Sequence, residues 1–234
     1  MLKKSILSLS LAASLVASDD YDIKVGEQLY TDTCASCHGI DGNGNKQMKL
    51  VVNSRKLTKT ILTQEQSYFI IKDGAHHWGS HADIMPAFKF VYNEFQLRSL
   101  SHYISKEFNK DIKKKINTLY NQSKKVPENK KADMLNRGKK IYNRNCTWCH
   151  GKEGKGNGEA TKNPIDSIYP YDLTKTLLTS TQMFLYAKEG GHFWGTFKDD
   201  MPYWKKKYDD YTLKSVIKYI DVVIRDKSKK EQDK

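Results

Sequence analysis

The sequence predicts an all-α protein built from two small helical domains in tandem, and three observations support this prediction. The chain contains two segments that match one another at a constant offset. Each segment begins and ends in a run whose apolar residues recur at helical spacing. No segment alternates apolar and polar residues as a half-buried strand would. A length of 234 residues suits one or two domains of ~100–200 residues each.

The repeat is first seen near the start of each copy, where Gly26 and Tyr30 match Gly138 and Tyr142 (138 − 26 = 112). After a four-residue insertion in the second copy the offset becomes 116, as in Met85-Pro86 and Met201-Pro202. A period this long exceeds the ~20–50 residues of solenoid repeats. It indicates a duplicated small domain.

Each copy is predicted to begin with a short helix and to end with a longer amphipathic one. The Gly and Tyr of each first helix are four residues apart, so they share one face. The apolar positions that predict the last helices are Phe95, Leu100, Tyr103 and Phe108 in the first copy and Leu213, Val216, Ile217, Tyr219 and Ile220 in the second. Loops rich in Gly, Asn and Asp, such as residues 41–45, lie between them.

The connector between the copies, residues 109–134, is rich in lysine. Within it, an apolar set predicts one side of a helix that packs against a domain: Ile112, Ile116, Leu119 and Tyr120. Pro127 is expected to end that helix, because proline lacks the amide hydrogen and restricts the residue before it. Residues 226–234 form a charged tail that we expect to fray.

Residues 1–18 have the pattern of a secretory signal peptide. Two lysines precede an apolar run over residues 6–17, and small side chains follow at the expected cleavage position. The alternative is an uncleaved anchor, but the run falls short of the ~20 residues that span a bilayer. Cleavage after Ser18 leaves 234 − 18 = 216 residues in the periplasm.

The net charge is +13, and loss of the signal peptide with its two lysines leaves 13 − 2 = +11. A strongly basic surface attracts acidic redox partner proteins and speeds their encounter. The alternative is that the lysines only solvate the surface. An exported chain of this kind is not expected to bind nucleic acid, and its association with membranes is expected to be peripheral at most.

The motif Cys-x-x-Cys-His occurs once in each copy, at the positions Cys34, Cys37 and His38 and at Cys146, Cys149 and His150. It is the attachment pattern of c-type haem: two thiols bind one porphyrin, and the next imidazole coordinates its iron. Disulfides, a zinc site or redox-active thiol pairs are the alternatives. None of them explains a histidine directly after both pairs, so we expect two covalently bound haem c.

Met85 and Met201 are the candidate sixth iron ligands, because they are equivalent in the repeat and each precedes a proline that stiffens its loop. Methionine as core filler is the alternative. His76 and His192 are also equivalent, and each lies just before a Trp-Gly pair. We expect them to pack in the loop or to bond a haem propionate, with axial ligation as a further alternative.

Together, Gly-x-x-x-Tyr, Cys-x-x-Cys-His, Met-Pro and the closing helix make each copy resemble class I cytochrome c. Two copies in one exported chain resemble the di-haem cytochromes of the cytochrome c4 type. The resemblance implies two cytochrome c domains, residues 19–108 and 135–225. It implies thioether bonds at the four cysteines, and close crossing of the first and last helices at Gly26 and Gly138, against Tyr103 and Tyr219. The His-Trp-Gly element and the long charged connector depart from the c4 pattern.

An iron with His on one side and Met on the other has no open position for a substrate, which favours electron transfer over catalysis. We therefore expect a periplasmic carrier between a respiratory donor and a terminal oxidase or reductase, without enzymatic activity of its own. The alternatives are the cytochrome subunit of a larger dehydrogenase complex and a di-haem peroxidase. A di-haem thiosulfate dehydrogenase is disfavoured, because all four cysteines are used for attachment.

Replacing Cys34 or Cys146 by serine is expected to prevent its half of the chain from folding. A domain of about 90 residues buries little apolar surface, and a covalently attached porphyrin supplies an apolar plate for its loops to cover. Far-UV circular dichroism and thermal unfolding test this. Normal helicity and normal stability in either variant would contradict it.

Overall fold

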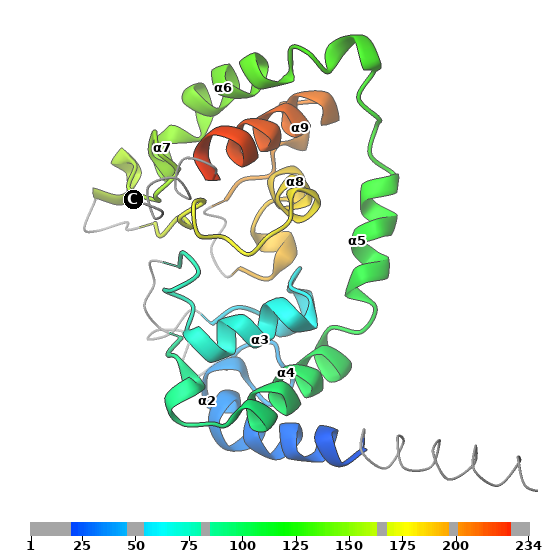
Figure 1. The fold of residues 1–234 in the computed structure, drawn as a ribbon, viewed down its shortest axis with the longest axis vertical. Coiled ribbons are helices and arrows are strands. Elements are labelled where there is room, and N and C mark those ends of the chain that lie inside the picture. The colour runs from blue at the N-terminus through cyan, green and yellow to red at the C-terminus, as the bar shows by residue number, and fades with distance from the viewer. Residues whose placement is uncertain (1–19, 46–53, 81–84, 163–167, 197–200, 226–234) are drawn as a thin grey trace, which may run out of the picture.

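The computed structural model describes residues 20–45, 54–80, 85–162, 168–196 and 201–225. Across these residues the chain is helical and contains no strand, as predicted (Figure 1). Within the same ranges, no helix combines the length and the apolar character needed to cross a bilayer. The expected signal peptide and the charged tail lie outside the described residues.

The α-helices of the two domains are equivalent and occur in the same order, whereas some of the short helical turns differ. The first domain contains helix 20–29, a π-helical turn Tyr30–Cys34, α2 (Ala35–His38), Leu57–Lys59, α3 (Gln64–Asp73), Phe88–Phe90 and α4 (Glu94–Phe108). The second contains α6 (Met134–Asn145), α7 (Thr147–His150), Glu159–Lys162, α8 (Ser180–Glu189), His192–Trp194, Trp204–Lys206, α9 (Asp210–Tyr219) and Ile220–Arg225. In Figure 1 the two domains lie one above the other, with α5 (Ile112–Asn121) along one side.

The first and last helices of each domain cross at a glycine, as the resemblance implied. A side chain at Gly26 would collide with the Ser99 carbonyl and with Cβ of Tyr103. In the second domain, a side chain at Gly138 would collide with the Ser215 carbonyl and with Tyr219. The backbones therefore approach more closely than any other residue type permits.

The apolar stripe of α4 differs from the prediction at Phe95, whose side chain is 48% exposed and stacks on Tyr21. The predicted Leu100 and Tyr103 are buried, and Leu97 and Ile104 are buried in addition. The reason is geometric. Positions 97, 100 and 104 follow the i, i+3, i+7 spacing of one helical face, whereas position 95 is turned well away from position 100.

The connector is an ordered part of the second domain's packing, which confirms the predicted helix. Ile112 and Ile116 of α5 are buried in the core around α8 and α9, and Tyr120 meets Phe184 edge to face at 5.7 Å. The helix ends at Asn121, earlier than Pro127 requires. Just beyond this end, the Ser123 hydroxyl donates a hydrogen bond to the Tyr120 carbonyl.

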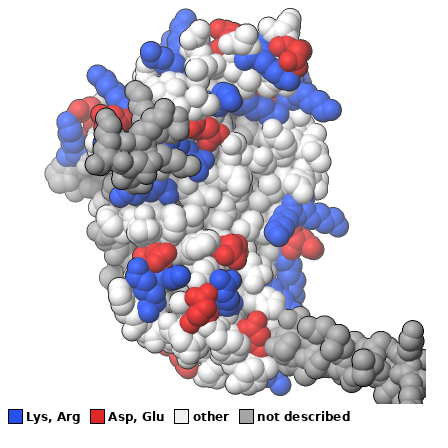
Figure 2. All heavy atoms as spheres, in the orientation of Figure 1, with Lys and Arg blue, Asp and Glu red and all other residues white. Residues whose placement is uncertain are grey.

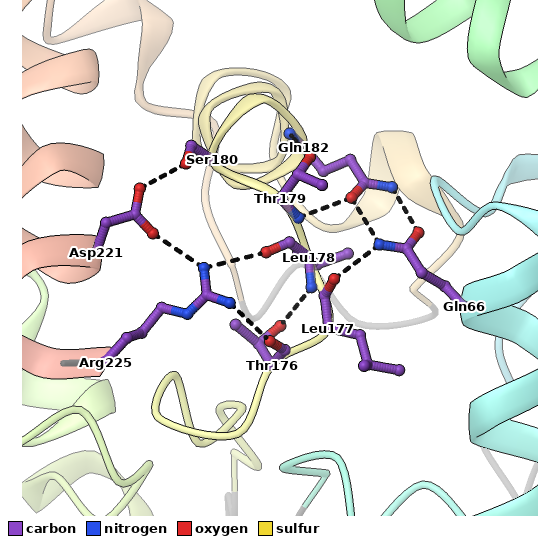
Figure 3. A network of polar contacts seen from close by, with 9 residues as sticks. All are labelled: Gln66, Thr176, Leu177, Leu178, Thr179, Ser180, Gln182, Asp221 and Arg225. Atoms are coloured by element: carbon purple, nitrogen blue, oxygen red, sulfur yellow. Dashed lines mark hydrogen bonds and ion pairs between the residues drawn. The ribbon is translucent and has the colours of Figure 1, made fainter. Parts of the chain in front are cut away.

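The domains are joined by an interface in which repeat-equivalent residues bond one another (Figure 3). The Nε2 atoms of Gln66 and Gln182 each donate to the other's Oε1, at 2.9 and 2.7 Å. Gln66 also donates to the Leu177 carbonyl, and Gln182 donates to the Ile61 carbonyl. Since 177 − 61 and 182 − 66 are both 116, the contacts have pseudo-two-fold symmetry. Each amide Oε1 also accepts its own helix's N-cap N–H, so both amides use all their hydrogen-bonding capacity.

The same symmetry extends to the backbone of the Trp-Gly pair. Lys56 N–H donates to the Gly195 carbonyl at 3.0 Å, and Asp172 N–H donates to the Gly79 carbonyl at 2.8 Å. Both glycines have positive φ, 95° at Gly79 and 89° at Gly195, and lie directly against the other domain's backbone. The Trp-Gly pair of the His-Trp-Gly element, which departs from the cytochrome c4 pattern, therefore forms part of the interface between domains.

Gly138→Ala is expected to lower the free energy of unfolding of the second domain by about 2 kcal/mol, because the added methyl group meets a backbone carbonyl that cannot move aside. Chemical denaturation followed by circular dichroism measures this. The control is Lys139→Ala on an exposed site of the same helix, which we expect to leave stability nearly unchanged. Equal effects of the two substitutions would contradict the crossing argument.

Candidate functional site

The two candidate iron-ligand histidines are the last residues of the short helices α2 and α7. Their Nδ1 atoms are held by backbone carbonyls: His38 bonds the Arg55 carbonyl at 3.2 Å, and His150 bonds the Tyr171 carbonyl at 3.0 Å. A bond at Nδ1 fixes the ring and leaves Nε2 as the nitrogen that can coordinate a metal.

Both imidazoles are in the form that iron requires. Burial lowers the pKa of His38 and of His150, while the bond to the carbonyl acts in the opposite direction. The net shift is downward from a usual pKa near 6.5. At neutral pH both rings are therefore neutral, with a lone pair on the nitrogen that faces away from the carbonyl.

The four cysteines lie beside these histidines in equivalent positions, and no disulfide joins them. Burial raises the pKa of Cys34 to about 12, and the neighbouring Cys37 adds to the rise. The pKa of Cys146 is likewise raised to about 12 by burial and by Cys149. Cys34 and Cys146 are therefore uncharged thiols at neutral pH.

Backbone hydrogen bonds hold each Cys-x-x-Cys-His turn in one conformation. In the first domain Gly44 N–H donates to the His38 carbonyl, and the Tyr30 hydroxyl donates to the Gly39 carbonyl at 2.6 Å. The second domain repeats both bonds with Gly156 and His150 and with Tyr142 and Gly151. The Gly-x-x-x-Tyr motif thus links the first helix to the turn that carries the histidine.

The Met-Pro segments are fixed next to helices α3 and α8. Ala75 N–H donates to the Met85 carbonyl at 3.1 Å, and the equivalent Gly191 N–H donates to the Met201 carbonyl at 2.8 Å. Gly74 and Gly190 have positive φ and lie against these segments. Met85 packs against the first domain's core, and the Met201 side chain is partly buried.

His76 and His192 are both exposed, on the turn that leads into the interface. His76 Nδ1 lies 3.2 Å from the Ser80 carbonyl within that turn, in line with the expected packing in the loop. The exposed position of both histidines gives no support to axial ligation.

Sequence reasoning missed one group near both histidines. Arg55, whose carbonyl bonds His38, extends its side chain to the second domain, where its Nη1 lies 3.3 Å from the Tyr186 hydroxyl. Its guanidinium carbon lies 5.3 Å from the ring centre of Tyr171, whose carbonyl bonds His150. The repeat contained a clue to this contact, because 171 − 55 = 116 makes Arg55 and Tyr171 equivalent positions of the two copies.

The donor set fits haem c and does not fit zinc. Among the described residues no group of three or more His, Cys, Asp or Glu side chains is arranged to hold a metal ion by itself, so the four cysteines form no zinc site. Each domain instead contains two adjacent cysteines, an oriented imidazole and a fixed Met-Pro segment. These are the groups that a covalently attached, six-coordinate haem requires.

Comparison with known families identifies both halves of the chain. Residues 23–107 match the family model described as Cytochrome c. Residues 133–220 match the model described as Cytochrome C oxidase, cbb3-type, subunit III.

Two of the curated proteins that are similar to this chain are subunits of one type of oxidase. The cbb3-type cytochrome c oxidase subunit FixP of Azorhizobium caulinodans is 26% identical over 83% of this chain and 57% of its own length. The subunit CcoP of Helicobacter pylori (strain 52) is 24% identical over 85% of this chain and 57% of its own length. The chain thus spans less than two thirds of the length of these relatives.

Among solved structures, a chain of the Kuenenia stuttgartiensis reducing HAO-like protein complex aligns with 84% of this chain and 94% of its own length. The TM-score is 0.43 and the sequence identity is 21%.

Proposed function

The chain is a tandem of two class I c-type cytochrome domains, and from this premise we propose that it transfers electrons through two covalently bound haem c groups. The observation that carries the proposal is the repetition, in both domains, of a Cys-x-x-Cys-His turn whose histidine is neutral and oriented by a carbonyl. We propose domain limits of 19–108 and 135–225, joined by 109–134.

We assign the haem-binding residues by their place in the two domains. Cys34, Cys37, Cys146 and Cys149 form the thioether bonds. His38 and His150 would bind iron through Nε2, and Met85 and Met201 would each supply a thioether ligand. Support comes from the hydrogen bonds within the protein that fix each histidine and each Met-Pro segment.

A haem iron held in this way supplies a one-electron couple that changes oxidation state with little rearrangement. The protein's part is to keep the ligand atoms in place in both states. The carbonyls of Arg55 and Tyr171 fix the rotation of the two imidazoles. The bonds to the Met85 and Met201 carbonyls fix the loops that carry the thioethers. With both ligand positions occupied, the chain is an electron-transfer component and not a catalyst on its own.

We propose that the electron acceptor is a respiratory oxidase, either as a separate partner or as the complex to which the chain belongs. The relatives FixP and CcoP are named as subunits of cbb3-type oxidases, which favours the second arrangement. We also propose that both domains lie in the periplasm, because residues 1–18 have the pattern of a signal peptide. The basic charge of +13 favours acidic partners. In Figure 2, Lys and Arg side chains are prominent at the top of the face shown, where some acidic side chains lie among them, and basic and acidic side chains also mix over α3 and α4.

Met85→Ala and Met201→Ala are each expected to remove half of the long-wavelength absorbance band of methionine-ligated ferric haem and to produce one high-spin iron per chain. The thioether is the ligand that both features depend on. Absorbance and electron paramagnetic resonance spectra of the oxidised protein measure this. The control is Met183→Leu, a volume-conserving change at a buried methionine of the second core, which should leave the spectra unchanged. Full retention of the band in either alanine variant would refute the ligand assignment.

Electron transfer with an acidic redox protein is expected to slow about tenfold or more as salt rises from about 0.01 M to about 0.15 M, because the Debye length falls from ~30 Å to ~8 Å. Stopped-flow absorbance measures the second-order rate. Reduction by an uncharged quinol is the control and should change little. A rate with the acidic partner that is equally insensitive to salt would contradict electrostatic steering.

A further inference from the structure

The guanidinium of Arg55 has no carboxylate partner among the residues that the structure describes. It lies against the rings of Tyr171 and Tyr186, at 5.3 and 5.8 Å from their centres, and donates a hydrogen bond to the Tyr186 hydroxyl. No carboxylate among the described residues lies within ion-pair distance of it. Contact with aromatic rings offsets part of the lost hydration of a cation, but a partly buried charge is normally paired.

This cation lies between the two stretches of chain that hold the candidate iron ligands. The carbonyl of Arg55 itself accepts the bond from His38, and the carbonyl of Tyr171, beneath its guanidinium, accepts the bond from His150. The next residues along, Lys56 and Asp172, form the symmetric backbone bonds between domains. The interface thus joins the two haem-binding loops, with one positive charge at the junction.

Position 55 and its equivalent, position 171, carry different residues, Arg and Tyr, and electrostatics explains the difference. At another paired position of the interface, Gln66 and Gln182, the two copies present the same residue. An arginine at position 171 would place two guanidinium groups on facing loops, where like charges repel. Tyrosine instead offers a ring and a hydroxyl to the single cation. The interface between the two domains therefore contains one guanidinium at this pair of positions, not two.

We propose that Arg55 binds propionate carboxylates of the bound haem groups at the domain interface, so that both redox sites share one cationic anchor. The proposal rests on the two-haem assignment above. Propionates are the carboxylates that haem brings into the protein, and a guanidinium is the side chain whose fork matches a carboxylate in two parallel hydrogen bonds. The cofactor would then supply the anion that the described residues do not provide.

A shared cation affects both iron centres in the same direction. Positive charge nearby favours the reduced iron, which carries one positive charge less, and neutralises propionates that would otherwise favour the oxidised iron. Removing the charge should lower both potentials. We expect the ratio of reduced to oxidised haem at a fixed potential to fall roughly tenfold at each site, equal to about 59 mV for a one-electron couple.

The test is a spectroelectrochemical titration of the full holoprotein carrying Arg55→Gln. The control is Arg98→Gln, which removes the same charge from an exposed ion pair with Glu94 and should leave both midpoints nearly unchanged. Arg55→Lys keeps the charge but loses the fork, so it should lower both midpoints by a smaller amount. Haem per chain is measured in every variant by the pyridine haemochrome assay.

Lowering of both midpoints in Arg55→Gln, beyond the shift in Arg98→Gln, supports the proposal. Lowering of one midpoint only, or of neither, overturns it. If Arg55→Gln does not fold, Arg55→Lys decides, and midpoints equal to those of the wild type overturn the proposal. A wild-type protein with fewer than two haems per chain would instead refute the two-haem assignment on which the proposal rests, and the titration would not be needed to show it.

Discussion

Three consecutive residues in each domain tie together the candidate iron ligand, its attachment loop and the other domain. In the first domain, residues 55–57 accept the bond from His38, donate to Gly195 across the interface and donate to the Gly42 carbonyl. Residues 171–173 make the equivalent three bonds to His150, Gly79 and Gly154. Because adjacent backbone groups make all three, none of these parts can shift without moving the others. The orientation of the histidine, the conformation of the attachment loop and the arrangement of the domains therefore depend on one another.

The interface achieves its rigidity with polar groups. The amides of Gln66 and Gln182 each cap their own helix and bond the other domain, so no hydrogen-bonding group of either amide is left unsatisfied. A fully satisfied polar network fixes one geometry, whereas an apolar contact of the same size tolerates sliding. Ile61 adds an apolar contact, since it is buried in the second domain's core. Electron exchange between two redox sites depends on their separation, so a single domain arrangement gives a single rate.

Local patterns predicted the fold and the candidate ligands, because each depends on neighbours in sequence. The resemblance to class I cytochrome c implied the helix crossing, and the apolar face of α5 predicted the packed connector. The interface was not predicted, because it depends on pairs separated by more than 100 residues. Gln66 also has a complete local explanation as the N3 residue of a capping box, which conceals its second role. Arg55 was missed for a similar reason, since a single arginine in a loop has no local partner that marks it.

The symmetry of the scaffold makes its asymmetric positions informative. Ser36 and Trp148 occupy the same position between the two cysteines of their motifs, yet the indole of Trp148 is 63% exposed. A protein that approaches the second attachment turn therefore meets a large aromatic surface that the first turn lacks. Arg55 and Tyr171 are a second equivalent pair that differs, and they lie at the interface between the domains. The two copies thus share the same set of backbone hydrogen bonds around the candidate ligand. Substitutions at equivalent positions, at the interface and on the exposed surface, make the two domains distinct without disturbing those bonds.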